Sequence, residues 1–458
     1  MYAFCQVFIS NILRKKAGKY MNYKNALLRG TLFLTIAGLL SRIMGFFYRI
    51  FLANTIGAEG MGIYQLIFPI YSVCFSLCAS GIETAVSKLT AAKFAIEKPQ
   101  EAFRVLQAGL IITLTLSSCC SFIIFRYADI LSEVFLKEPR CTGLLKILAI
   151  TIPFGTTQSC ICGYYFGIHK AGVPSIAQLV EQTMRIGCVF FLYNIYITNG
   201  MEISPAIAVI GLVFGELCSL LFTITCFSFR PREKYNISFS CIFTPFKEIT
   251  SLSTPLTISR ICVNLLASLE ATLIPNALKA YGMDSATALS VYGILNGMAL
   301  PFILFPNALT GSIAMMLLPA VSESQAEGNL SVLKNTIKRT FSFCLVLGFG
   351  CFLFFLIFGN FLGEFVFSNP FAGNFITILA WICPFLYLNT TLTSVLNGLG
   401  KTSVTFFNGI LGLFIRIGFI FLGIPKIGIH GYLFGLLASQ LFVTFSALFY
   451  LYRILKTS

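Results

Sequence analysis

Residues 337–358 read IKRTFSFCLVLGFGCFLFFLIF, and their composition indicates the fold class. From Phe341 to Phe358 it contains no charged side chain. About 20 apolar residues are enough for a helix to cross the hydrocarbon core of a bilayer. The run lacks the alternation of polar and apolar residues that marks a strand of a transmembrane β-barrel. It therefore predicts a transmembrane helix and excludes a barrel.

The composition of the whole chain agrees with this interpretation. Of 458 residues, 57% are hydrophobic and 11% are charged, whereas an ordinary soluble domain has roughly 25% charged residues. The mean hydropathy is +0.86. This is more apolar surface than a core of this size could bury, so the surplus must face lipid. The chain is thus predicted to be an all-α polytopic membrane protein, which excludes a soluble enzyme.

Comparable apolar runs recur along the whole chain and predict about twelve transmembrane helices. Only helices and closed barrels satisfy every backbone polar group inside lipid, so these runs should form a helix bundle. The predicted spans cover residues 31–53, 63–82, 105–125, 144–168, 174–197, 205–228, 249–274, 286–307, 337–358, 374–398, 403–424 and 428–452.

The basic residues predict the orientation of the bundle. Of the 32 Lys and Arg residues, 21 lie before the first span, in alternate loops or at the span ends that border them, or in the tail; five lie on the opposite side, and the remainder lie deeper within spans. Because basic loops stay on the cytoplasmic side, both termini are expected in the cytoplasm. The net charge of +15 is then mainly a topology signal, and we expect no nucleic-acid partner.

Residues 1–20 are considered separately, because their apolar part precedes their basic cluster, whereas a signal peptide has its charges first. Met21 begins a stretch that could equally be the biological start. Two interpretations stay open: residues 1–20 are a non-native extension, or they form a short interfacial anchor.

Cysteine and histidine give no reason to expect a metal or a cofactor. Most of the 16 cysteines fall inside the predicted spans, where Cys behaves as a small hydrophobe. Of the only two histidines, His169 lies in a predicted loop and His430 at the start of the last predicted span. We therefore expect no metal site, no cofactor and no catalytic residues.

An internal repeat divides the chain into two halves. A shift of 231 residues aligns Ile147-Leu148-Ala149 with Ile378-Leu379-Ala380, and it also aligns Arg185-Ile186-Gly187 with Arg416-Ile417-Gly418. Twelve of the 44 positions from 147 to 190 are identical at this shift. Each repeat then holds six helices, and an even number makes the repeats parallel rather than inverted.

The repeat predicts two six-helix lobes around a central cleft. The N-terminal lobe should comprise residues 21–230 and the C-terminal lobe residues 247–458, with residues 231–246 as a cytoplasmic linker. Substrate sites in such folds lie between the repeats.

Arginine residues inside the spans are the candidate site residues. Arg42, Arg185, Arg260 and Arg416 fall near the bilayer midplane, and Arg49 lies on the same helical face as Arg42. Placing an arginine at the bilayer midplane costs at least about 2.5–3.5 kcal/mol of insertion free energy. Such a residue should therefore face a water-filled cavity or form an ion pair inside the bundle. We predict all five as substrate-binding residues, and the alternative is that they connect helices through ion pairs.

Acidic residues are fewer in the spans. Glu181 precedes Arg185 by four residues and can pair with it along one helix, and Glu216 lies in the middle of its span. These two are candidates for ion coupling or for ion pairs. The cleft should be net cationic, which suits an anionic ligand such as a phosphate, because guanidinium binds phosphate oxygens bidentately and keeps its charge.

Several motifs resemble the stage V sporulation protein B family. They are SRIMGFFYR at residues 41–49, IGAEGMGIYQ at 56–65, PLTISR at 255–260 and LPA at 318–320. This family belongs to the polysaccharide-exporter branch of the MOP superfamily, which also holds the MATE drug exporters and the MurJ-type lipid II flippases. The resemblance extends from Met21 to the C-terminus.

The resemblance implies a V-shaped transporter of the bacterial cytoplasmic membrane that works by alternating access. Its cargo would be an undecaprenyl-pyrophosphate-linked saccharide, such as a peptidoglycan or spore-cortex precursor or another polysaccharide unit. Cell-wall or sporulation machinery would be candidate partners, and Arg42 and Arg260 would be cavity cations. The main alternative is a MATE-like exporter of small organic solutes or drugs, which normally needs acidic cavity residues. A scaffold without transport activity is a third interpretation.

Overall fold

The computed structural model describes residues 2–228, 243–326 and 330–457, with side chains from Thr35 onward except at a few positions in α8, α11, α12 and α17. Within these ranges every regular element is a helix. The first half contains α1 (Tyr2–Phe75), the π-helix η1 (Ser76–Ser80), α2 (Gly81–Ala95), α3 (Pro99–Arg126), α4 (Ala128–Ile130), η2 (Leu131–Phe135), α5 (Cys141–Gly167), α6 (Gly172–Thr198) and α7 (Ala206–Ser228).

The second half follows the same pattern of long helices interrupted by short ones. It contains α8 (Phe243–Ala280), α9 (Ser285–Gly293), η4 (Ile294–Ala299), α10 (Leu300–Leu304), α11 (Asn307–Ala326), α12 (Leu330–Phe367), α13 (Pro370–Leu379), η5 (Ala380–Ile382), α14 (Cys383–Gly398), α15 (Thr402–Leu422), α16 (Ile424–Ile427) and α17 (Ile429–Thr457). Most of the predicted linker, residues 231–246, lies outside the described residues.

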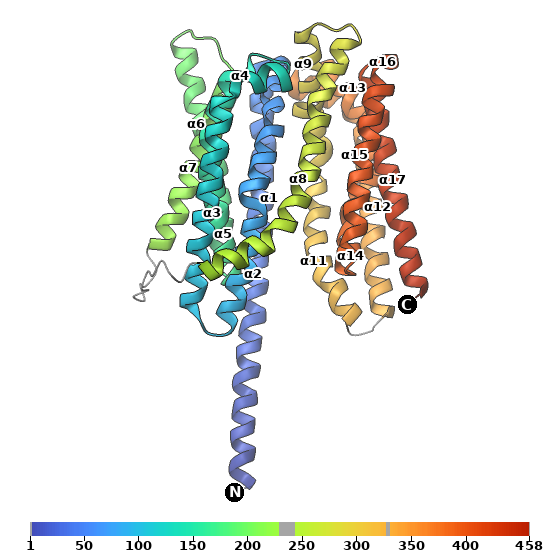
Figure 1. Cartoon of the computed structure of the whole chain (residues 1–458). Helices are drawn as coiled ribbons and strands as arrows, with labels where there is room; N and C mark the ends of the chain where they lie inside the picture. The colour runs from blue at the N-terminus through green and yellow to red at the C-terminus, as the bar shows by residue number, and fades with distance from the viewer. Residues whose placement is uncertain (1, 229–242, 327–329, 458) are drawn as a thin grey trace.

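The long helices run up and down in two lobes that stand side by side (Figure 1). Both termini lie at the lower end in this view, which we call the terminal end. The opposite end carries α4, α9, α13 and α16, and we call it the α9 end. The two termini lie at the same end because the chain crosses between the two ends an even number of times.

Ten helical stretches in the described part are long and apolar enough to cross a membrane. The first of them, Thr35–Ala95, contains two of the predicted spans. Helix α6, which coincides with the predicted span 174–197, is not among the ten, and it carries Glu181 and Arg185. All twelve predicted spans coincide with helices, so the all-helical membrane fold is confirmed.

A single glycine separates the first two predicted spans. Gly57 has φ 71° and ψ 179°, and the residues on both sides of it are helical. A side chain at this left-handed φ would be strained, which is why glycine is suited to the position. The chain reverses there, so that residues 58–75 return toward the terminal end (Figure 1).

The buried core shows how the lobes meet. One hydrophobic cluster contains residues of both lobes, for example Leu52 and Met61 together with Leu289 and Leu295. Toward the terminal end there are two separate clusters. One lies around Val86 and Leu106 and includes Ile249 of α8, and the other lies around Leu317, Val395 and Leu451. Apart from the first half of α8, which packs against α2 and α3 of the N-terminal lobe, the lobes therefore pack together toward the α9 end and separate toward the terminal end, as the two legs of a V.

Two glycines allow the lobes to approach closely at the α9 end. A Cβ on Gly62 of α1 would lie 2.1 Å from the carbonyl oxygen of Leu289, and a Cβ on Gly293 of α9 would lie 2.1 Å from that of Ala58. We call this contact, residues 58–62 against residues 289–293, the glycine seam. At this contact the backbones of the two segments touch directly, and only glycine, which has no side chain, permits this.

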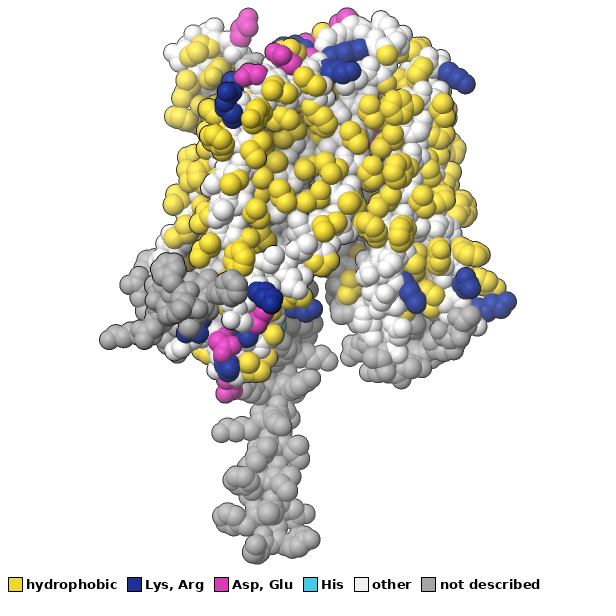
Figure 2. Space-filling model, in the orientation of Figure 1, with side chains coloured by type: hydrophobic (Ala, Val, Ile, Leu, Met, Phe, Trp, Pro, Cys, Tyr) yellow, Lys and Arg dark blue, Asp and Glu magenta, His cyan; other side chains and the backbone are white. Residues whose placement is uncertain are grey.

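The outer surface is suited to lipid. Figure 2 shows a broad band of hydrophobic side chains, with charged side chains gathered above and below it. Helix α12 contributes strongly to the exposed apolar surface, with Val346 and Phe365 more than 70% exposed. Such a band on an all-helical chain indicates a multi-pass membrane protein.

Candidate functional site

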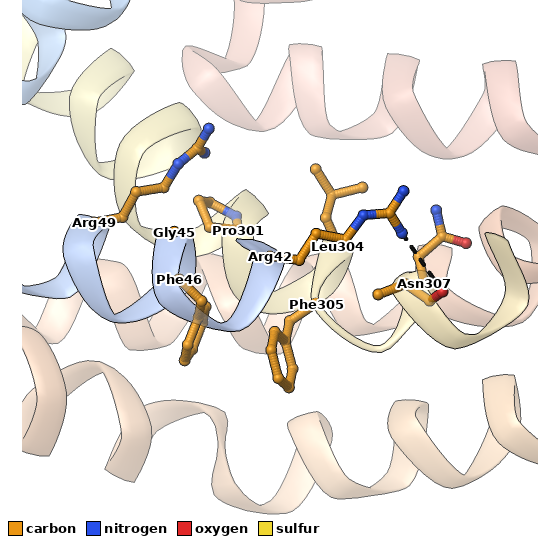
Figure 3. A pocket seen from close by; sticks show the side chains of 9 residues that line it. Arg42, Gly45, Phe46, Arg49, Pro301, Leu304, Phe305 and Asn307 are labelled. Atoms are coloured by element: carbon orange, nitrogen blue, oxygen red, sulfur yellow. Dashed lines mark hydrogen bonds between the residues drawn. The ribbon is translucent and has the colours of Figure 1, made fainter. Parts of the chain in front are cut away.

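A cavity of about 350 Å³ lies between the two lobes. Helix α1 of the N-terminal lobe forms one wall, and the α10–α11 region of the C-terminal lobe forms the other (Figure 3). It is lined by Arg42, Gly45, Phe46, Arg49, Pro301, Leu304, Phe305, Asn307 and Ala308. Two of the five predicted arginines, Arg42 and Arg49, are thus brought together.

Helical periodicity places these two arginines on one wall. They are seven residues apart, which is close to two turns, and Figure 3 shows both side chains on the same side of α1. The residue between them on this face, Gly45, adds no side chain to the cavity. Both arginines are exposed, and neither forms an ion pair with a described residue.

The opposite wall is a break in a helix. Helix α10 ends at Leu304 and α11 begins at Asn307, with Pro306 between them. Arg42 Nη1 donates a long hydrogen bond of 3.5 Å to the carbonyl oxygen of Ala308 in the first turn of α11. This contact is weak, so the guanidinium remains available to a stronger acceptor.

The amide of Asn307 is oriented by two hydroxyl groups. Its Oδ1 accepts hydrogen bonds from Thr310 Oγ1 at 2.5 Å and from Thr390 Oγ1 at 2.9 Å. The side-chain nitrogen of Asn307 is therefore the atom that can donate a hydrogen bond to a ligand. Sequence analysis missed Asn307, because no local pattern marked it.

Arg260 contacts the other lobe at a different place and does not line this cavity. From α8 it donates Nη1 to the carbonyl oxygen of Ser80, at the end of the π-helix η1, at 2.9 Å. Asn264, one turn further on, donates to Ser76 Oγ. Arg42 and Arg260 thus make equivalent contacts: each reaches from the first helix of its own lobe to a backbone carbonyl of the opposite lobe.

Arg185 and Arg416 lie inside their lobes. Arg185 pairs with Glu181, and both side chains are about four-fifths buried. Arg416 pairs with Glu270 at 3.1 Å, and Tyr432 donates to the same carboxylate at 2.7 Å. The two arginines that the repeat aligns therefore hold equivalent internal ion pairs, although the Glu270 partner lies far away in the sequence.

The polar interior also contains the buried carboxylate of Glu216 and a second cavity. Glu216 is buried, accepts a hydrogen bond from Tyr71 at 3.3 Å and packs against Gly155. A second cavity, of about 290 Å³, lies beside the Arg416–Glu270 pair and is also lined by Asn296 and Gln440. Among the residues that the structure describes, no group of three or more His, Cys, Asp or Glu could hold a metal ion.

Comparison with known proteins places this geometry in context. A family model described as "Polysaccharide biosynthesis protein" matches residues 27–325. Stage V sporulation protein B of Bacillus subtilis (strain 168) is 29% identical over 429 residues, which cover 92% of this chain and 82% of that protein. Lipid II flippase MurJ of the same organism is 22% identical, with 85% of this chain and 76% of that protein covered.

Solved structures show the same fold. An inward-facing multidrug resistance MATE family transporter of the MOP superfamily superposes with a TM-score of 0.71. The sequence identity is 16%, and the match covers 93% of this chain and 99% of that one. At this identity the likeness is one of architecture, and the substrate must be argued from the site.

Proposed function

The chain belongs to the polysaccharide biosynthesis protein family, and from this premise we propose that it flips an anionic, undecaprenyl-pyrophosphate-linked saccharide across the bacterial cytoplasmic membrane. The cargo would be a peptidoglycan or spore-cortex precursor, or another polysaccharide unit. Cell-wall or sporulation machinery would act on it before and after transport. The membrane-exporter class is supported by the relatives, and the identity of the cargo is the proposal.

The observation that carries the proposal is the unneutralised positive charge of the cavity between the lobes. Arg42 and Arg49 face it without an acidic partner among the described residues, and Asn307 adds a neutral donor. Guanidinium keeps its charge and forms bidentate hydrogen bonds with phosphate oxygens. A pyrophosphate would replace the weak contact between Arg42 and the Ala308 carbonyl.

The arrangement of the lobes supports alternating access. They share one core toward the α9 end and have separate cores toward the terminal end, where only the first half of α8 crosses to the N-terminal lobe among the described residues. With the terminal end in the cytoplasm, this is an inward-open state that admits the head group from inside the cell. Rocking of residues 21–230 against 247–458 would then expose the cavity to the other side.

Ion coupling, if the cycle requires it, has one candidate. Glu181 forms an ion pair with Arg185, so its carboxylate already has a partner. Glu216 is buried and forms no ion pair with any described residue. We propose Glu216 as the coupling residue and Arg185 and Arg416 as residues that hold helices together within their lobes.

The proposed orientation makes a direct prediction. Leu136 follows η2 and Gly200 joins α6 to α7, so both lie at the α9 end. A reporter enzyme that works only outside the cytoplasm, fused after either residue, should be active, whereas the same reporter after Ser458 should be inactive. Activity after Ser458 together with inactivity at the other two sites would reverse the proposed orientation.

A transport assay separates the proposed function from its main rival. Purified protein in liposomes should move a fluorescent undecaprenyl-pyrophosphate disaccharide between leaflets, measured as loss of access to an added reagent. The same liposomes should show no uptake of an organic cation dye, because an anion-binding cavity repels cations. Uptake of the dye without movement of the saccharide would favour a MATE-like drug exporter.

A further inference from the structure

A buried carboxylate lies between the lobes at the α9 end and does not line the cationic cavity. Glu138 belongs to the loop between η2 and α5, yet its side chain is only 5% exposed. Isolated charges are rarely buried, and they are retained when partners compensate them. The partners of Glu138 therefore indicate its role.

The partners come from both lobes. Arg140 of the same loop donates Nε to Glu138 Oε1 at 2.6 Å. From the C-terminal lobe, Ser285 Oγ donates to Oε2 at 3.0 Å, and Lys279 Nζ lies 3.7 Å from the same oxygen. Lys279 also donates to the carbonyl oxygen of Lys137 at 3.2 Å.

Both sides of this contact are held in place by local structure. On the N-terminal side, the backbone N–H of Glu138 donates to the Ser132 carbonyl at 2.9 Å. On the C-terminal side, Asp284 caps α9 by accepting from the backbone N–H of Thr287 at 3.1 Å. This cap orients the first turn of α9, which begins with Ser285.

We propose that Glu138, Lys279 and Ser285 form an ionic latch that closes the α9 end of the transporter and breaks whenever the cleft opens at that end. The adjoining glycine seam supplies close apolar packing, and the latch adds charged and directional contacts at its rim. Together they hold the lobes shut on one side while the other side is open.

The latch can release because Arg140 belongs to the same lobe as Glu138. When the lobes separate, Lys279 and Ser285 leave, but Arg140 still neutralises the carboxylate. Removing all partners from a buried charge is strongly unfavourable. In the proposed opening, Arg140 moves together with Glu138, and water solvates Lys279 and Ser285. Opening therefore leaves no buried charge without a partner.

The pKa of Glu138 is consistent with a latch that stays charged at neutral pH. Burial tends to raise this pKa, but the hydrogen bonds from Arg140 and Ser285 and the charges of Arg140 and Lys279 lower it overall. A lowered carboxyl pKa means that the latch persists above the ordinary carboxyl range and weakens only as the pH falls below it. Other groups at the cluster are the backbone carbonyl of Lys137, the thiol of Cys141 and, through Arg140, the carboxylate of Glu59.

Hydrogen exchange of the full-length protein in nanodiscs, without substrate, tests this proposal. In Glu138→Gln, amides in residues 131–141 and 279–293 should exchange at least about tenfold faster, as expected for loss of a compensated buried charge. Residues 84–95 and 311–322 at the terminal end should become more protected, because the lobes close there. A merely local loosening would not produce this distant change.

Asp129→Asn is the matched control. It removes the ion pair of 3.5 Å between Asp129 and Lys146, which lies within one lobe and outside the glycine seam, and leaves the contacts between lobes intact. It should exchange like the wild type. If Glu138→Gln does not fold, Lys279→Met should give the same two-ended change. Equal exchange in Lys279→Met and wild type, or a change confined to the α9 end, would overturn the latch. Because no substrate is present, this result is independent of the proposed cargo.

Discussion

Arg42→Ala should lower the rate of saccharide flipping by more than about thirtyfold while leaving the amount of folded protein in the membrane near normal. Truncating one partner of a desolvated charge pair costs roughly 2–5 kcal/mol, which corresponds to this loss or more. Arg42 is exposed to the cavity, and its single hydrogen bond to Ala308 is long. Its side chain therefore contributes little to folding, and the loss should appear in transport alone.

Two companion variants sharpen this experiment. Arg42→Lys keeps the charge but loses the bidentate geometry, so a partial defect is expected. Arg126→Ala is the control, since Arg126 is exposed at the end of α3, where it lies over the ring of Tyr127. The measurement is flipping in liposomes, normalised to folded protein by size-exclusion chromatography. Absence of folded Arg42→Ala protein would show that Arg42 serves helix packing instead.

Gly62→Ala should impair both stability and transport. Its Cβ would lie 2.1 Å from the Leu289 carbonyl oxygen and 2.8 Å from the carbonyl carbon. These are backbone atoms, so no side chain can turn away, and α1 and α9 must move apart. Overpacking of this kind costs typically 1–3 kcal/mol and occasionally more. The thermal unfolding midpoint in detergent should fall, and transport should fall with it because the α9 end no longer closes.

Gly187→Ala provides the matched control for the glycine seam. Gly187 lies within α6, and a Cβ there would meet no atom within 4 Å. Alanine is a better helix former than glycine by up to about 1 kcal/mol, so this variant should be as stable as the wild type or slightly more stable. If Gly62→Ala were as stable and active as Gly187→Ala, the close approach of the lobes would not be needed for function.

Much of the fold follows from local sequence, because lipid imposes its requirement segment by segment. Each span must be apolar over its own length, so runs such as residues 337–358 identify helices without knowledge of their neighbours. The pairing of Glu181 with Arg185 was also predictable, since residues four apart share a helical face. The repeat was visible for the same reason, as a comparison of the chain with itself.

The partners of the other arginines depend on contacts between distant segments. No spacing rule connects Arg416 with Glu270, Arg42 with the Ala308 carbonyl, or Arg260 with Ser80. The sequence predicted all five arginines as substrate-binding residues, with ion pairs between helices as the alternative. The structure places two of them in internal ion pairs, two in the cavity and one in a contact elsewhere between the lobes. Their ligand roles therefore stay predictions that the variants above test.

Local sequence features are enough to identify a membrane bundle built from two related halves with cationic residues inside its predicted spans. Which of those cations face a cavity, where the lobes touch, and how Glu138 joins them all depend on how the chain folds in three dimensions. The physical reason is that hydrophobicity and helical periodicity act within a segment, whereas charge compensation depends on which segments meet. Glu138 illustrates this most clearly: an acidic residue in a polar loop is unremarkable in the sequence, and only the approach of Lys279 and Ser285 from the other lobe makes it a contact between lobes.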